Sequence, residues 1–523
     1  MMENLIKKEV GYVTKVNSYL LSIKGLPSAR INDIIVDEEG RKAVVHSLLP
    51  GSIEALFLDN KPASPGIEFF IDSEGSRIHI GEHLKGKVLN ALGEVVSDNG
   101  IGKRYKGNFS EKLSFDKKAR DIDSRSFIDR QLVTGFALVD ITLPIGKGQR
   151  ELIYGPIHSG KNDFLRDVAI NQKELQNICI YAAIGKPVNF TSGLIKVLEE
   201  NDAMDNTIIV SALSDESAPM ISIAPSTAFL IAEHFCNQGK DVVLILDDLG
   251  IHAKYLREIA LLSNQFPGRE SYPGDMFYRH ASLMERSGSF NDKQGNGTIT
   301  LLPVLETDME GFTNMIPTNL MGSTDGHLLF SKEIHAEGFK PAISVLQSVT
   351  RVGHATHNKI QRELSTSIIN ILSEYPRQQE YSRFGTQLSS HARDILKRGR
   401  IISELMNQKN IGFLSLTTQI LLLALVFTRF FEPEDRDLDF IGFERENIIK
   451  TLEEGKSLAG AREMTSSKDL GFSDLLIELE KGINELEVAT GKNKDSSSSS
   501  NIVKEKDKEP VEDDKDIGVA EEE

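Results

Sequence analysis

The sequence has only two cysteines, Cys179 and Cys236, among 523 residues. It also has no N-terminal apolar segment that would serve as a secretion signal. Disulfide-rich proteins belong to oxidising compartments, whereas the cytoplasm keeps thiols reduced. We therefore expect a cytoplasmic protein, in which Cys179 lies in an apolar run and fills the core.

Positive charge is also scarce. The chain has 60 Lys and Arg against 77 Asp and Glu, a net charge of −17. From Thr490 onward it has eleven acidic residues and six lysines, so the rest of the chain keeps −12. Because neutralising phosphates requires clustered Lys and Arg, this acidic body argues against nucleic acid as a partner.

One apolar segment imitates a membrane span, Phe413 to Phe427 (FLSLTTQILLLALVF). It is shorter than the ~20 residues needed to cross a bilayer, and it contains Ser, Thr and Gln. We expect a buried helix here and a chain that is not itself transmembrane.

Three patterns follow one another, which predicts a multidomain protein. Between Gly11 and Leu89, short β-like runs predict a small β-barrel or sandwich: GYVTKV, DIIVDEE, KAVVHSLL, SIEALFL and GIEFFID. From Gln131 to Ala355, continuous apolar runs alternate with helical patterns, as in an α/β core with a largely parallel sheet: ELIYG, NICIYAAIG, TIIVSALS, DVVLILDD, TITLLPVLET and PAISVLQSV.

After His357 the pattern is helical to about Val488, as in HNKIQRELSTSIINILSEY and SSHARDILKRGRIISELMN. The last segment contains SSSSS and KEKDKEPVEDDKD. It has no apolar face to bury, so we expect a disordered acidic tail.

Residues Gly155 to Asn162 read GPIHSGKN, which differs in its last residue from the phosphate loop G-x-x-x-x-G-K-[ST]. They follow the candidate strand ELIYG and precede the helical pattern KNDFLRDVAI, as a phosphate loop requires. In such a loop, backbone N–H groups and the lysine hold phosphates, and the hydroxyl holds Mg²⁺. Lys161 is present, whereas Asn162 offers a metal an amide oxygen instead of a hydroxyl.

A second candidate is the apolar run DVVLILDD, which ends in Asp247 and Asp248. A carboxylate at the end of such a strand is the usual partner of a phosphate loop, where it meets Mg²⁺ directly or through water. The alternative is an aspartate that caps the next helix. With a phosphate loop upstream, we expect Asp247 to serve the metal.

Long motifs make the chain resemble the α subunit of the F-type ATP synthase family from Gly11 to about Leu486: TGFALVDITLPIGKGQRELIYG, ILDDL, PGRESYPGDMFY, LPVLET, IPTNLMGSTDG and PAISVLQSVTRVG. The resemblance implies an N-terminal β-barrel (1–92), a RecA-like nucleotide-binding domain (93–357) and a C-terminal helical domain (358–488), before the tail (489–523). It also implies a ring of three alpha-like and three beta-like chains around a gamma-like rotating shaft.

The resemblance separates the chain's own site from that of its neighbour. Catalytic β chains carry a glutamate that polarises water where this chain has Lys186, and α chains usually carry Gln there. The chain's own site therefore lacks a general base. Arg351, in SVTRVG, matches the arginine finger that α chains extend into the adjacent β site. The alternative is a strand-end arginine in a surface ion pair.

The same resemblance assigns the base pocket. Lys340 and Pro341 replace an Arg-Pro pair that flanks the adenine, and Gln408 and Asn410 align loosely with two adenine-facing glutamines.

Family α chains read G-D-R-Q-T-G-K-T in the phosphate loop, and this chain departs from that pattern. The implied phosphate contacts are Gly155, His158, Ser159, Gly160, Lys161 and Asn162. We expect a non-catalytic site that binds Mg-ATP or Mg-ADP weakly, with Asp247 and Asn162 as the metal's protein ligands, or that holds phosphate without a firm metal.

Only ten residues precede the first strand, where family α chains have a helix that attaches to a peripheral stalk. With the altered loop and the added tail, this favours a specialised ATP-driven motor, such as those of wall-less bacteria, some linked to motility. We expect a peripheral complex at the cytoplasmic face of the membrane. The alternatives are an α subunit of a proton-coupled synthase, a hexameric nucleic-acid translocase and a purely structural ring member.

Overall fold

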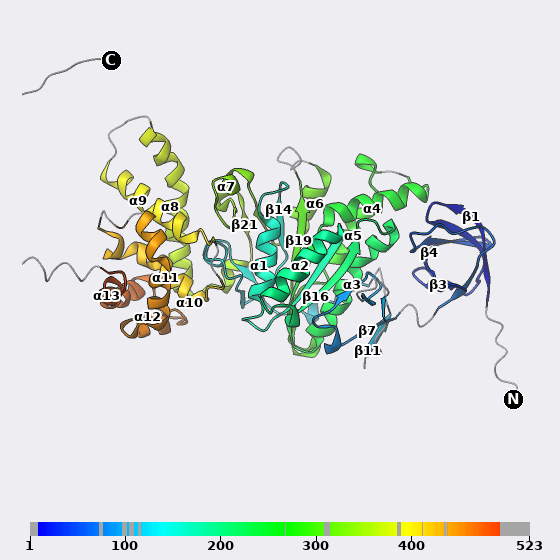
Figure 1. Cartoon of the computed structure of the whole chain (residues 1–523), viewed down its shortest axis with the longest axis horizontal. Helices are drawn as coiled ribbons and strands as arrows, with labels where there is room; N and C mark the ends of the chain where they lie inside the picture. Colours follow the sequence, from blue (N-terminus) through cyan, green and yellow to red (C-terminus); the bar gives the residue numbers. More distant parts are fainter. Residues whose placement is uncertain are drawn as a thin grey trace, which may run out of the picture.

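The structure is a computed structural model, and it describes residues 9–72, 77–96, 102–103, 109–112, 117–266, 268–307, 314–383, 389–409, 412–433, 436 and 438–491. Three parts follow one another along its long axis, namely a barrel, a helix-covered sheet and a group of helices (Figure 1). The predicted fold class is confirmed. The acidic tail from residue 492 onward lies outside the described residues.

The N-terminal part is a closed barrel in the order β1-β2-β5-β4-β3-β6. Inward-pointing residues such as Ile23, Val45 and Phe69 form one apolar core, because side chains alternate along a strand. Each of the five predicted runs contains a strand. The strands are β1 (Gly11–Asn17), β2 (Leu20–Gly25), β3 (Ile34–Asp37), β4 (Lys42–Leu49), β5 (Ser52–Phe57) and β6 (Glu68–Ile71).

The middle part is a sheet whose central strands run parallel in the order β8-β16-β15-β17-β19-β14-β20, with β21 antiparallel at the edge. These strands are β8 (Val88–Leu89), β14 (Glu151–Gly155), β15 (Ile178–Lys186), β16 (Thr207–Leu213), β17 (Asp241–Asp247), β19 (Thr298–Glu306), β20 (Gly326–Leu329) and β21 (Val349–Thr350). Short accessory strands are β7 (Arg77–Ile80), β9 (Val95–Val96), β10 (Gly102–Lys103), β11 (Phe109–Lys112), β12 (Gln131–Leu132), β13 (Ile145–Gly146) and β18 (Gly288–Ser289).

Helices bury both faces of this sheet (Figure 1). In β15, Ile180 and Ala182 join one apolar cluster with α3, α4 and α5, while Cys179, Tyr181 and Ala183 join another with α1 and α2. Burial on both faces explains why these strands read as unbroken apolar runs. The helices are α1 (Lys161–Asn171), α2 (Val188–Glu200), α3 (Ala218–Asn237), α4 (Leu249–Leu262), α5 (Met276–Met284), α6 (Met315–Ser323) and α7 (Lys332–Ala336).

The predictions for this part differ from the structure in detail. PAISVLQSV is not one strand, because the 3₁₀ turn Val345–Gln347 lies between an isolated bridge at Ile343 and β21. The strand beside β14 is instead β20, which was not predicted. A domain boundary was predicted at residue 92. The barrel strands end at Ile71, before that residue, and β8, which also precedes it, already pairs with β16 of the central sheet. Cys179 is a core residue, as predicted.

The C-terminal part is helical, as predicted, and packs around α10 (Leu416–Ala424). Leu421, Leu422 and Leu423 are fully buried there, which confirms the buried helix predicted for Phe413 to Phe427. Within the described residues, every helix is too short or too polar for a bilayer span. The other helices are α8 (Lys359–Arg383), α9 (Ser390–Met406), α11 (Leu438–Glu454), α12 (Ala459–Met464) and α13 (Phe472–Ala489).

A buried ion pair ties α5 to α3. Arg286, just after α5, places its Nε 2.7 Å from Glu233 Oε1, and the two side chains are 1% and 5% exposed. Lys117 Nζ lies 2.8 Å from the other carboxylate oxygen of Glu233. Burial alone would raise the pKa of Glu233, but Arg286 outweighs it and the pKa is lowered. The pair therefore stabilises the fold above pH ~4.5, and this contribution is lost as pH falls through the lowered pKa.

We predict that Glu233→Met destabilises the central domain by about 3–5 kcal/mol, because it leaves the Arg286 charge buried without its partner. The double variant Glu233→Met/Arg286→Met should recover most of that loss. Hydrogen exchange of α3 amides under increasing urea measures both. A double variant no more stable than Glu233→Met would show that the loss comes from packing and not from the stranded charge.

Candidate functional site

The predicted phosphate loop joins the C-terminal end of β14 to the N-terminal end of α1. Gly155 has φ 151°, and a Cβ there would lie 2.5 Å from the backbone oxygen of Phe330. Gly160, at the N-cap of α1, has φ 82°, which favours glycine. These two glycines therefore form the tight turn that delivers the loop's N–H groups to the start of α1.

Lys161 is folded back onto this loop and is only 3% exposed. Its Nζ donates hydrogen bonds to Pro156 O and, at 2.8 Å, to Gly155 O. Ser159 Oγ also donates to Pro156 O, at 2.7 Å. Burial lowers the pKa of Lys161 to about 8, while Glu306, Asp248 and Asp247 oppose that shift. Contact with a phosphate requires this ammonium group to turn away from the loop carbonyls.

The two loop residues that depart most from the usual pattern point to solvent. His158 and Asn162 are both exposed, and His158 has φ 59°. Asn162 is in the first turn of α1, the place where a phosphate loop offers its metal-binding hydroxyl.

Lys186, left open by the sequence, contacts Asp247. The ends of the parallel strands β15 and β17 lie together, and Lys186 Nζ is 2.7 Å from Asp247 Oδ1. The ammonium also lies 5.1 Å from the ring centre of Phe190. Burial opposes the charged form of Lys186, but attraction to Asp247 and Asp248 outweighs it and raises the pKa. Lys186 is therefore a cation at neutral pH, held inside the site.

The second oxygen of Asp247 is also engaged, since Tyr181 OH donates to Oδ2 at 2.8 Å. Sequence reasoning missed Tyr181, because its contact depends on the register of β15 against β17. Asp248 has a structural role, since it caps the next helix, which was the alternative interpretation of this pair of aspartates. Its Oδ1 accepts from Ile251 N at 2.6 Å and caps α4, and its Oδ2 accepts from Glu306 N at 2.8 Å. Burial raises the pKa of Asp248 to about 6.

These residues do not fit a magnesium ion. Mg²⁺ in a nucleotide site is held by one or two carboxylates together with phosphates. Asp247 is already paired with the ammonium group of Lys186, which a metal bound directly to this buried carboxylate would have to displace. In the described part of the chain, no group of three or more His, Cys, Asp or Glu is placed to hold a metal.

Arg351 lies at the edge of the sheet, directly after β21. Its side chain is exposed, and within the described residues its guanidinium makes no hydrogen bond or ion pair. Its backbone is held, because Arg351 N donates to Asp325 O at 3.0 Å. The alternative of a surface ion pair is therefore not what the described residues show.

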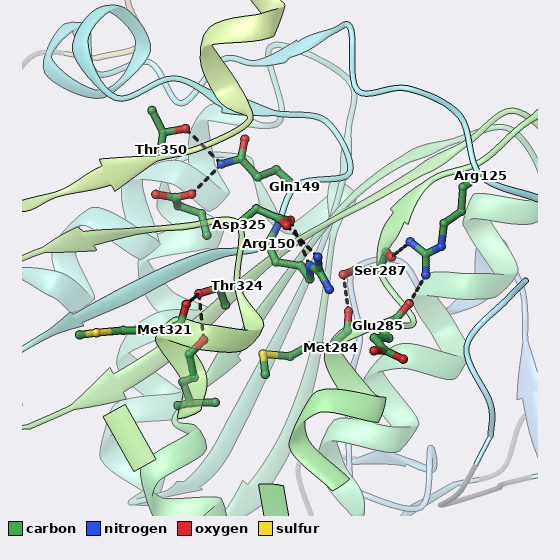
Figure 2. A network of polar contacts seen from close by, with 12 residues as sticks. Arg125, Gln149, Arg150, Met284, Glu285, Ser287, Met321, Thr324, Asp325 and Thr350 are labelled. Carbon is green, nitrogen blue, oxygen red and sulfur yellow. Dashed lines mark hydrogen bonds and ion pairs between the residues drawn. The ribbon is translucent and has the colours of Figure 1, made fainter. Parts of the chain in front are cut away.

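A polar network fixes this edge (Figure 2). Arg150 grips the Asp325 carboxylate through Nε at 3.0 Å and Nη2 at 2.7 Å. Gln149 Nε2 donates to Thr350 Oγ1 at 3.2 Å, and that hydroxyl donates to Pro144 O at 2.8 Å. Thr350, which precedes Arg351, and Asp325, which accepts its backbone N–H, are thus both bound to the residues directly before β14. This strand leads into the phosphate loop.

Of the predicted base-pocket residues, Lys340, Pro341 and Gln408 lie together, but the side chain of Gln408 is already hydrogen-bonded within the chain. Its Oε1 accepts from Ala137 N at 2.6 Å, and its Nε2 donates to Gly135 O at 2.9 Å. Its backbone N donates to Lys340 O at 2.7 Å, beside the buried Pro341. The Lys340 side chain is exposed. A contact between Gln408 and a base would break these bonds, and Asn410 lies outside the described residues.

A cavity of about 590 Å³ lies elsewhere, between the barrel strand β4 and helices α3, α4 and α5. His46, Ser222, His252 and Arg279 are among its lining residues, and none of the predicted site residues is.

Comparisons with known proteins agree with this architecture. The family model "ATP synthase alpha/beta family, nucleotide-binding domain" matches residues 135–350, and "ATP synthase alpha/beta chain, C terminal domain" matches residues 358–471. ATP synthase subunit alpha of Mycoplasma genitalium is 34% identical over 409 residues, 78% of each chain. That of Mycoplasmoides gallisepticum is 33% identical over 469 residues, 87% of this chain and 88% of its own. That of Caldanaerobacter subterraneus subsp. tengcongensis is 34% identical over 424 residues, 81% and 83%.

The chain belongs to the F-type ATPase alpha subunit family. The resemblance inferred from the motifs is thereby confirmed. The two predicted sites differ in what their key side chains contact. In the chain's own site, Lys161 bonds to loop carbonyls and Asp247 is paired with Lys186. Arg351, in contrast, is held only by its backbone, and its side chain is exposed.

We predict that Gln408→Ala loosens the junction between the nucleotide-binding and helical domains. Gln408 is 4% exposed, and its loss leaves Ala137 N and Gly135 O without their partner. Each unsatisfied buried group costs about 1–3 kcal/mol. Hydrogen exchange over residues 134–142 should accelerate at least tenfold, and the thermal midpoint should fall. Gln379→Ala, an exposed change on α8, is the matched control and should alter neither. Unchanged exchange in Gln408→Ala contradicts the bridging role.

Proposed function

We propose that the chain is a non-catalytic alpha-like subunit of an F-type rotary ATPase hexamer, with three alpha-like and three beta-like chains around a gamma-like shaft. In this proposal it binds nucleotide weakly at its own altered loop. It donates Arg351 to the ATP-hydrolysing site of the adjacent beta-like chain. Family membership supports the assembly, and the exposed, backbone-anchored Arg351 is the observation that carries the catalytic role.

The proposal that the chain's own site does not turn over is supported by the contacts of Asp247 and Asp248. A general base must orient a water molecule with a free carboxylate near the phosphates. Asp247 is paired with Lys186, and Asp248 accepts from two backbone N–H groups. The position that would carry the catalytic glutamate holds the cation Lys186 itself. These contacts support a site that binds without hydrolysing.

An arginine finger acts by stabilising charge on the transferring phosphoryl group, an effect of roughly 10³–10⁵ in rate. It must be rigid at its base and free at its tip. The Arg150–Asp325 pair and the Gln149–Thr350 bond fix the edge that carries Arg351 (Figure 2). The Arg351 side chain is exposed, so Arg351 meets both conditions.

We predict that Arg351→Ala lowers ATP hydrolysis by the assembled ring at least 10³-fold and leaves assembly intact. Arg351→Lys should recover little of the activity, because an ammonium lacks the planar fork of guanidinium donors. Arg30→Ala, an exposed arginine in the barrel, is the control and should hydrolyse ATP normally. Steady-state hydrolysis and native mass spectrometry measure the two properties. Normal turnover by an intact Arg351→Ala ring rules out the finger assignment.

We also propose that the motor is specialised for ATP hydrolysis and acts as a peripheral complex at the cytoplasmic face of the membrane, with motility or membrane-anchored machinery as its load. The altered loop supports this, since His158 and Asn162 replace residues of the usual pattern. The alternative is a proton-coupled synthase.

Purification of the native complex from cells, followed by mass spectrometry of its chains, separates these two. We expect a beta-like ATPase and a gamma-like shaft together with large unfamiliar partners and no proton ring. Peripheral-stalk and proton-ring subunits recovered in stoichiometric amounts make the complex a synthase instead.

A further inference from the structure

The side of the nucleotide site where a metal is expected holds an internal ammonium group. We infer that this site binds nucleoside di- and triphosphates without a divalent metal, with Lys186 supplying the positive charge that Mg²⁺ supplies elsewhere. The inference deepens the proposed function and rests on it for the identity of the ligand.

The first support is the pairing of Asp247. Its side chain is fully buried, and its two oxygens face Lys186 Nζ at 2.7 Å and Tyr181 OH at 2.8 Å. The Lys186 side chain is 10% exposed and also lies against the Phe190 ring. A metal bound to Asp247 directly must displace this ammonium from a buried carboxylate and leave the cation near a like charge. Both changes oppose metal binding.

The second support is that Lys186 and Lys161 share one site. Lys161 begins α1 directly after the loop that follows β14, and Lys186 is the last residue of β15. Both strands belong to one parallel sheet, in which β17 and β19 lie between them, so both lysines lie at its carboxyl edge. A nucleotide's phosphates placed at the start of α1 would therefore meet two protein cations.

The third support is the residue that follows Lys161. The hydroxyl of a phosphate loop is the second protein ligand of Mg²⁺. Here the position holds the exposed Asn162, so the hydroxyl that a phosphate loop offers the metal is absent. Both protein groups that would fix the metal are thus changed, one by substitution and one by an internal ion pair.

The ligand that fits this arrangement is a metal-free nucleoside polyphosphate. One ammonium from the loop and one from the end of β15 lie beside it, together with the N–H groups at the start of α1. Added Mg²⁺ forms the metal complex in solution and so removes the species that the site prefers. Binding should therefore stay the same or weaken as Mg²⁺ rises.

Isothermal titration of the purified full-length chain with ADP, in EDTA and in excess Mg²⁺, tests this. We expect the affinity in EDTA to equal or exceed that in Mg²⁺. Lys186→Gln should reverse the order, with binding at least tenfold weaker in EDTA and recovered by Mg²⁺, because Asp247 is then free. Lys186→Arg keeps the charge and should retain metal-independent binding. Lys196→Gln, on an exposed lysine whose side chain is 75% exposed, is the control and should behave as wild type.

Mn²⁺ electron paramagnetic resonance gives a readout independent of affinity. In the presence of ADP, the wild-type chain should leave the spectrum of Mn²⁺-ADP unchanged, and Lys186→Gln should immobilise the ion. Wild-type binding at least tenfold tighter with Mg²⁺, or no ADP binding in either condition, overturns the inference. Neither result touches Arg351, whose role is judged by ring hydrolysis alone.

Discussion

Both functional ends of this chain depend on one constraint, the packing of β14 between the parallel strands β19 and β20. At its carboxyl end, β14 ends at Gly155, where the phosphate loop begins. Directly before β14, Gln149 and Arg150 bind Thr350 and Asp325 (Figure 2), and Arg351 follows Thr350 in the chain. Because a strand hydrogen-bonded on both sides does not slide, the loop and the arginine keep a fixed separation.

Strand β14 thus connects to two nucleotide sites, the chain's own site and, through Arg351, the proposed site of the adjacent chain. In the proposed ring, the loop faces the chain's own nucleotide while Arg351 faces that of the neighbour. The Arg150–Asp325 pair, whose side chains are 28% and 19% exposed, joins the Arg351 edge to this strand. The altered loop and the retained arginine are therefore linked by structure, although their sequence positions are far apart.

The sequence predicted correctly those elements that have a regular apolar pattern or a long apolar run. Five of the six barrel strands, most of the parallel core and the helix at Leu416–Ala424 have strong periodicity or strong apolarity, and they lie where they were predicted, whereas β2 was not predicted. Sequence reasoning also missed β20, because GHLL is four residues with little pattern, and it overextended PAISVLQSV, because an apolar run beside a proline also suits a turn. Burial decided both cases, and burial of a short run depends on neighbours distant in the chain.

The site shows the same limit. The glycines and Lys161 stood out from the loop motif, Asp247 from its place after an apolar strand downstream of that loop, and Arg351 from the family resemblance. The contact of Lys186 with Asp247 did not, because it depends on which strands are neighbours and on their register. The same holds for Gln408, which an alignment placed near a base but which bonds to Gly135 and Ala137.

These internal contacts also explain how the loop tolerates its substitutions. A buried lysine or aspartate without a partner costs several kcal/mol, so a site that has lost its metal ligands should be a weak point of the fold. Here Lys161 bonds to loop carbonyls, and Asp247 is paired with the ammonium group of Lys186 and accepts a hydrogen bond from Tyr181. These polar groups thus find their partners within the chain itself. The substitutions in the loop therefore need not weaken the fold, and a nucleotide that binds there must replace the loop contacts of Lys161.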